Sequence, residues 1–194
     1  MLDADNATIS LTGDLRRDLR SATGPAHRRL DEMVEGLDVA TSRGLGIFLQ
    51  ASGAALDVLS PSLAQVSLPP IQPLQVAIAR DLGALGLRPI PPIGRVSVLS
   101  DDAALGAYYV IAGSRLGAQV LRRHHAASPD DRVRGADAYL TAPTGLGMWK
   151  AFIYRLVEVD SEISHAAVLN GAHHTFEVFF KAFKATLLTE GTGQ

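Results

Sequence analysis

Two features of this chain could serve chemistry rather than packing: a pair of glycines in the middle of a predicted helix, and one histidine near the N-terminus. The glycines, Gly113 and Gly117, lie four residues apart within 105–121. In a helix they share one face and leave it without side chains. Each costs roughly 1 kcal/mol of helix stability relative to alanine, so we expect a flat or bulky group to approach the backbone there. Another helix and a ligand are both candidates.

The histidine is His27, which follows a predicted break at Gly24-Pro25. From about residue 14 onward, apolar residues recur at spacings of three and four, the pattern of an amphipathic helix. Pro25 interrupts it because proline lacks an N–H and clashes with the carbonyl of Ser21. Either the helix kinks there, or Thr23 caps a new helix with Pro25 in its first turn. In both cases His27 lies beside the apolar stripe of a helix.

The other five histidines have less chemical context. His124 and His125 follow two arginines at a predicted helix end, where cations favour the helix dipole, and we interpret them as surface residues. His173 and His174 face different sides of the last predicted helix. His165 has no second histidine at metal-binding spacing. No two histidines are spaced as His-x-x-x-His, which argues against a zinc site.

The rest of the chain is predicted to form further helices, separated by breaks rich in proline and glycine. The expected helices cover 42–59, 74–85, 101–125, 130–140, 148–157 and 162–188, with an extended connection over 88–98. Thr41 is the expected N-cap of the helix over 42–59, which Ser60-Pro61 ends, and Asp101 or Ser100 is the expected N-cap of the helix over 101–125. Residues 1–12 are polar and aperiodic, and we expect a flexible N-terminal tail followed by one domain over 13–190. No alternating pattern predicts a strand. The fold class is therefore expected to be an all-α, single-domain helical bundle.

Composition narrows the function classes. The chain has 194 residues, 47% hydrophobic and 20% charged, which suits a globular domain with its own core. A net charge of -2 with mixed signs gives no reason to expect nucleic acid as a partner. The absence of cysteine excludes disulfides, thiolate-bound metal and thiol nucleophiles. No apolar run approaches the ~20 residues of a membrane span, and no signal-peptide pattern opens the sequence, so we expect a cytoplasmic protein without a membrane partner.

Two stretches around these residues resemble a known pair of helices. They are Leu19-Arg20-Ser21-Ala22-Thr23 with His27 and Leu30-Asp31, and Tyr108-Tyr109-Val110-Ile111-Ala112-Gly113-Ser114-Arg115-Leu116-Gly117. They are similar to the proximal and distal helices of heme oxygenases, especially the bacterial group often found with phytochromes. The similarity runs in order from about Leu15 to Phe183. It implies a helical bundle that holds heme between a proximal helix and a kinked distal helix.

The resemblance implies roles for His27 and for the two glycines. His27 would be the proximal iron ligand, through a neutral imidazole nitrogen. Gly113 and Gly117 would let the distal helix bend over the porphyrin with its backbone near the iron. Ser114 would support a network of ordered water rather than act as a nucleophile.

The resemblance also implies contacts around the edge of the heme. Arg20, Tyr108 and Lys150 occupy positions that contact heme propionates in the family. A cation or hydroxyl paired with a carboxylate suits such a place. Phe176 and Phe183 match aromatic positions that line the pocket, although an aromatic stripe on a helix also fits a core.

The activity implied by the resemblance is the oxidative cleavage of heme to biliverdin, with release of carbon monoxide and ferrous iron. Heme is both substrate and cofactor in that reaction, which consumes oxygen and electrons. The sequence contains no flavin or nicotinamide fingerprint. The electrons would therefore come from an external partner: a ferredoxin, a flavoprotein or a small reductant.

Two departures from the family pattern leave other functions open. Relatives usually have a glycine where this chain has Ala118, and bacterial relatives often have an acidic residue where it has Ala112. One alternative is a heme-binding or heme-sensing protein of the same fold without turnover. Another is a helical interaction domain whose glycine face packs on a partner helix.

Overall fold

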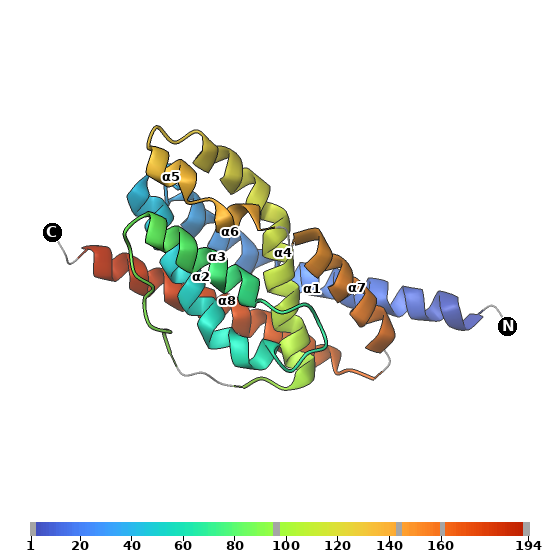
Figure 1. The fold of residues 1–194 in the computed structure, drawn as a ribbon. Coiled ribbons are helices and arrows are strands. Elements are labelled where there is room, and N and C mark those ends of the chain that lie inside the picture. Colours follow the sequence, from blue (N-terminus) through green and yellow to red (C-terminus); the bar gives the residue numbers. More distant parts are fainter. Residues whose placement is uncertain (1–2, 95–97, 143–144, 160–161, 192–194) are drawn as a thin grey trace.

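The computed structural model describes the backbone of residues 3–94, 98–142, 145–159 and 162–191, and the side chains from Leu15 onward except those of 145–146 and 190–191. Within these ranges the chain is a bundle of helices and contains no strand, which confirms the all-α expectation (Figure 1). The helices are α1 (Asp3–Glu35), α2 (Ser42–Leu63), α3 (Gln72–Ala84), α4 (Asp101–Ala126), α5 (Asp131–Gly135), α6 (Ala138–Thr141), α7 (Gly145–Val159) and α8 (His165–Gly191).

Helix α1 runs through Pro25 without a second start. The hydroxyl of Thr23 donates to the carbonyl of Leu19 at 2.7 Å, so it does not cap a new helix as one of the two expectations proposed. The backbone is helical from Asp3. Most of the segment 1–12, which was expected to be a flexible N-terminal tail, thus belongs to α1. The flexibility of the segment stays a prediction.

The start of α2 confirms a predicted cap, but its end does not match. The hydroxyl of Thr41 accepts a hydrogen bond from the N–H of Gly44 at 3.0 Å. The helix passes the predicted end at Leu59 and includes Pro61. A proline in the last turn removes only one hydrogen bond of the helix, so the turn can still close.

The predicted helices in the second half are present with shifted ends. The Ser100 hydroxyl caps α4 by accepting from the N–H of Ala103 at 3.4 Å. The helix expected over 130–140 is two short ones, α5 and α6, because Ala136 leaves helical geometry at φ -94° and ψ 66°. Of the expected connection over 88–98, the described residues form no helix, and 95–97 lie outside the described residues.

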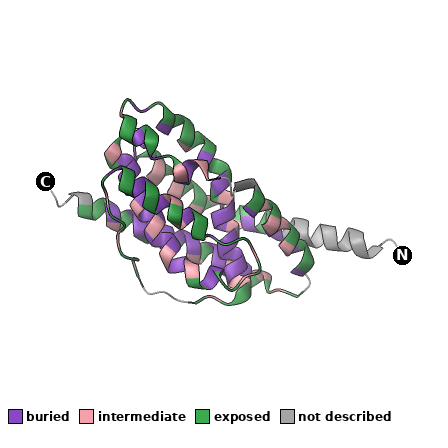
Figure 2. Ribbon diagram, viewed as in Figure 1, coloured by how far each residue is buried: buried purple, intermediate pink, exposed green. Residues whose placement is uncertain are grey.

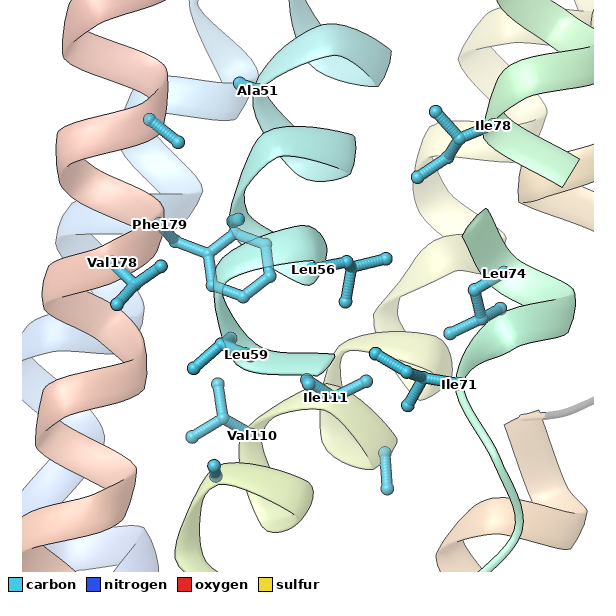
Figure 3. Close-up of a cluster of buried hydrophobic side chains, with 14 of the residues drawn as sticks. Ala51, Leu56, Leu59, Ile71, Leu74, Ile78, Val110, Ile111, Val178 and Phe179 are labelled. Atoms are coloured by element: carbon cyan, nitrogen blue, oxygen red, sulfur yellow. The ribbon is translucent and has the colours of Figure 1, made fainter. Parts of the chain in front are cut away.

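Helix α8 is the centre of the bundle. It packs against α4, α2 and α1, while α3 covers the outer side of α2 and α7 packs on α4. Buried residues gather in the interior of this arrangement and exposed ones along its outer turns (Figure 2). In Figure 3, Leu56 of α2 lies between Phe179 of α8 and Leu74 of α3, and Leu59 of α2 lies between Phe179 and Val110 of α4. The core is therefore built around α2 and α8, and it leaves one side of α1 and one side of α4 uncovered.

Helices α4 and α8 cross at a close contact made by two glycines. A Cβ placed on Gly106 of α4 would overlap the carbonyl oxygen of Val168, and one on Gly171 of α8 would overlap that of Ala103. Both glycines are buried. Close helix packing, one of the two uses expected for helical glycines, thus occurs in this chain at a pair that the sequence analysis did not single out.

Candidate functional site

His27 lies on the open face of α1 and is held by a carboxylate. Its side chain is 59% exposed, and its Nδ1 lies 2.7 Å from Oδ2 of Asp31, one turn further along the helix. Because the carboxylate accepts, Nδ1 carries the proton. No described residue bonds Nε2, whose lone pair is therefore free. This is the arrangement in which metal-binding histidines are usually oriented.

Phe176 of α8 supports the imidazole from the side. The two rings lie 6.1 Å apart, centroid to centroid, with an interplanar angle of 63°. Phe176 is only 3% exposed and also contacts the ring of Phe180 at 6.4 Å. The structure thus brings together two residues, His27 and Phe176, that the resemblance assigned to the same pocket. Phe183, the other aromatic position, is buried in the core against Phe48.

An uncovered apolar face, here called the glycine stripe, runs along α4 and consists of Gly113, Leu116, Gly117 and Val120. These residues share one side of the helix because they are spaced by three and four. A Cβ on Gly117 would meet no described atom within 4 Å, and one on Gly113 would meet only a ring carbon of Trp149, at 3.8 Å. Leu116 is 44% exposed and Val120 is 71% exposed. The stripe is therefore apolar and poor in side chains, and among the described residues only Trp149 packs on it, at Gly113.

Helices α1 and α4 are linked indirectly at two places, through α7 and through the segment after α1. At one end Trp149 of α7 lies beside Gly113, and the guanidinium of Arg16 on α1 lies 5.7 Å from the centre of the Trp149 ring. At the other end Nε2 of His124 on α4 lies 3.1 Å from Oδ1 of Asp38, just beyond α1. Elsewhere α1 packs on α8 and α7 (Figure 1).

The residues next to the two glycines do not obstruct the stripe. Ala112 and Ala118 are buried, so their methyl groups face the core. Ser114 is exposed, and its hydroxyl donates to the carbonyl of Ile111 at 2.8 Å, which leaves the oxygen available as an acceptor. The two departures from the family pattern therefore leave the bare face of α4 unchanged.

Tyr108 lies away from this region. It is 1% exposed, and its hydroxyl donates to the carbonyl of Pro69 at 2.9 Å. Burial raises the pKa of the phenol to about 12. Five residues before Gly113, it is turned about 140° from that glycine around the helix. A contact with a heme propionate would require breaking the bond to Pro69, so we leave Tyr108 out of the site.

The two cations assigned to propionates are exposed and available. Arg20 lies two turns before His27 on the same face of α1, and Lys150 follows Trp149 on α7. Neither makes an ion pair or hydrogen bond with another described residue. The structure is compatible with their binding an external anion.

The sequence analysis identified neither Trp149, which lies beside the glycine stripe, nor Arg115, which lies on the other side of α4. Arg115 is 7% exposed on the opposite side of α4 from the stripe, with its guanidinium 4.5 Å from the ring centre of Tyr139 and a hydrogen bond to the carbonyl of the same residue. Tyr139 in turn donates its N–H to the buried Asp81, at 2.8 Å. Burial raises the pKa of Asp81. Nothing local in the sequence marks these contacts, because their partners lie on other helices.

The described residues contain no group of three or more histidines and acids that could hold a metal ion. None of the helices in the described ranges is long and apolar enough to span a bilayer. A hollow between α2 and α3 and another between α1 and α8 are lined by described residues that include neither His27 nor a member of the glycine stripe.

The fold has a counterpart among solved structures. The heme oxygenase from Neisseria meningitidis, solved with NO and CO bound, superposes with a TM-score of 0.72 at 19% identity, over 89% of this chain and 91% of that chain. No family model and no curated protein matches the sequence. At this identity the likeness concerns the fold. This chain, an α1–α8 bundle with an uncovered glycine-bearing helix, has the heme oxygenase fold.

Proposed function

We propose that this protein is a heme oxygenase, which binds heme between α1 and the glycine stripe and cleaves it to biliverdin with release of carbon monoxide and ferrous iron. The observation that carries the proposal is the glycine stripe. A helix that keeps two glycines and two exposed apolar side chains on a face that only Trp149 of the described residues touches, at Gly113, has a surface suited to a flat apolar ligand. The fold, shared with a heme oxygenase, supports the same reading.

On the proximal side, His27 would hold the heme iron in this proposal. The bond from Nδ1 to Asp31 fixes the tautomer in which Nε2 has the free lone pair. The edge contact with Phe176 limits rotation of the imidazole. A neutral histidine of this kind could ligate heme iron through Nε2.

On the distal side, the chain's own residues leave space and hold water. Gly113 and Gly117 let a planar ligand approach the main chain, while Leu116 and Val120 exclude bulk water. Heme, when bound, supplies both the iron that activates oxygen and the ring that is oxidised. Ser114 Oγ accepts a hydrogen bond from an ordered water, since its own proton is directed to Ile111. The stripe contains no acid, so protons arrive through water rather than from a carboxyl group.

At the edge of the site, Arg20 and Lys150 pair with the two propionates. The natural setting in this proposal is the cytoplasm, in the phytochrome-associated bacterial group. Electrons come from a ferredoxin, a flavoprotein or a small reductant, because the sequence contains no nucleotide-cofactor fingerprint of its own.

Hemin titration of the purified protein tests the binding step. Trp149 is the only tryptophan and lies beside Gly113, so hemin should quench its fluorescence and shift the Soret band. In His27→Ala the Soret position should revert to that of free or weakly bound hemin. His124→Ala is a matched control, because His124 is also an exposed histidine paired with a carboxylate, but through Nε2. An unchanged spectrum in His27→Ala would overturn the proposed ligation.

Turnover distinguishes the proposal from its alternatives. Hemin-loaded protein given ascorbate and oxygen should lose the Soret band and gain the long-wavelength absorption of a bilin. A stable ferrous or oxygen complex without bilin would identify a heme-binding or heme-sensing protein. Failure to take up hemin at all would favour a helical interaction domain that covers the glycine stripe with a partner helix.

A further inference from the structure

A groove between α1 and α8 is lined by residues that the proposed function does not use. Its volume is about 410 Å³, within the range of small-molecule sites. It starts one aromatic contact away from the imidazole, since its wall includes Phe180, the neighbour of Phe176. None of the residues assigned to heme contributes to the lining.

The groove carries an uncompensated positive charge. Arg29, Lys181 and Lys184 line it together with a single acid, Glu177. None of these four side chains makes an ion pair with a described residue. The chain as a whole has a net charge of -2, so this excess of cations is local. Cations gathered without acidic partners attract an anion.

One of the cations is held in place by the apolar floor. The guanidinium of Arg29 lies 4.3 Å from the ring centre of Phe180, a cation–π contact that restrains the side chain and uses none of its N–H groups as hydrogen-bond donors. The floor continues with Leu187, 39% exposed, and Leu188, 62% exposed. Exposed leucines beside oriented cations suit a ligand with an apolar body and an acidic head.

We infer that the groove between α1 and α8 binds a small organic carboxylate with an apolar body, of the fatty-acid class. The carboxylate pairs with Arg29 and the two lysines, and the hydrocarbon covers Phe180 and the leucines. A planar guanidinium offers two parallel N–H donors, the geometry that a carboxylate accepts. The inference stands on the groove alone and holds whether or not the protein binds heme.

Calorimetric titration of the full chain with dodecanoate, below its micelle-forming concentration, tests the inference. Binding should weaken by about tenfold in Lys181→Gln/Lys184→Gln, the loss of about 1.4 kcal/mol expected when charge-assisted contacts are removed. Arg43→Gln/Arg88→Gln is the matched control, since it removes two exposed cations from α2 and the segment after α3. That variant should bind dodecanoate as the parent does, and acetate should not bind.

Other outcomes would overturn the inference. Equal binding of dodecyltrimethylammonium would show detergent-like adsorption, and an equal loss in the control variant would show a general charge effect. Loss of dodecanoate binding in Leu116→Ser/Val120→Ser would place the probe on the glycine stripe instead. Co-sedimentation with phosphatidylglycerol vesicles, but no binding of free dodecanoate, would identify a lipid surface as the partner.

Discussion

Helix α4 contains glycines in two opposite environments. Gly106, near its start, lies against the backbone of α8, and a methyl group there would overlap Val168. Gly117, three turns later, has no described atom within 4 Å of where a methyl group would stand. One glycine makes a helix crossing possible, and the other keeps a surface open. The same residue type on the same helix therefore has two different uses.

The difference shows what a helical glycine without a packing role indicates. A buried glycine at a helix crossing is explained by packing, because the close approach stabilises the fold. A glycine on an open face costs roughly 1 kcal/mol of helix stability and gains no packing in return. We interpret that uncompensated cost as a requirement of ligand binding. Variants at the two kinds of glycine test this interpretation.

The largest expected effect is at the crossing. Gly106→Ala should lower the free energy of unfolding by about 3 kcal/mol, because the new methyl group must separate two backbones that cannot yield locally. Gly171→Ala, on the opposite helix, should behave in the same way. Urea unfolding followed by circular dichroism measures both. A loss below about 0.5 kcal/mol would show that the crossing tolerates a side chain, and that Gly106 and Gly117 do not differ as stated.

The next effect concerns binding rather than stability. Gly117→Leu should weaken hemin binding by at least tenfold, about 1.4 kcal/mol, because the side chain would occupy the face proposed for the porphyrin. The free energy of unfolding should not fall, since leucine favours helix and meets no described atom there. Trp149 quenching and urea unfolding measure the two quantities. A variant that is destabilised but binds hemin normally would contradict both parts.

A smaller effect tests the open face without blocking it. Gly117→Ala should raise the free energy of unfolding by about 1 kcal/mol, the usual gain in helix propensity. The sign is opposite to that predicted for Gly106→Ala, which makes the two variants a matched pair. Thermal unfolding of both under the same conditions decides the matter. Destabilisation by Gly117→Ala would mean that another surface covers the stripe.

The smallest effect concerns Tyr108, which we assign to packing. Tyr108→Phe should cost about 0.5–1 kcal/mol at pH 7, through loss of the hydrogen bond to Pro69, and leave hemin affinity unchanged.

The same variant has a defined pH dependence. The pKa of Tyr108 in the folded protein, about 12, is above the ordinary phenol value of 10.0, so its contribution to stability is complete below pH 10 and is lost as the pH rises toward 12. The stability of the parent should therefore fall relative to Tyr108→Phe over that interval. Urea unfolding at several pH values measures the difference. Weaker hemin binding by Tyr108→Phe would show that the Tyr108 hydroxyl takes part in heme binding, contrary to this assignment.

Much of the fold could be predicted because its signals are local. The spacing of apolar residues predicted the helices, and Thr41 and Ser100 predicted two helix starts that the structure confirms. Helix ends were less accurate. Pro61 was taken as a stop although it lies in a last turn, and residue 136 breaks a segment that was expected to be one helix.

The candidate site was only partly accessible in the same way. His27 and the two central glycines could be identified from residue type, spacing and family resemblance. The positions of Trp149 and Arg115 could not, because each contacts a helix far away in the sequence. Tyr108 had the right residue type, but its hydroxyl is bonded to Pro69, and only the turn of α4 against its neighbours decides that.

The amino-acid sequence is enough to predict that this protein is helical, where α2 and α4 start, and that two glycines lie on one face of α4. Those properties depend on residues within a few turns of each other. Which glycine touches another backbone and which remains open depends on how the helices pack. The sequence does not show this, because glycine has no side chain whose polarity or size would indicate its neighbour. The helix that crosses at Gly106, and the absence of any described element over Gly117, give the two positions their different meanings.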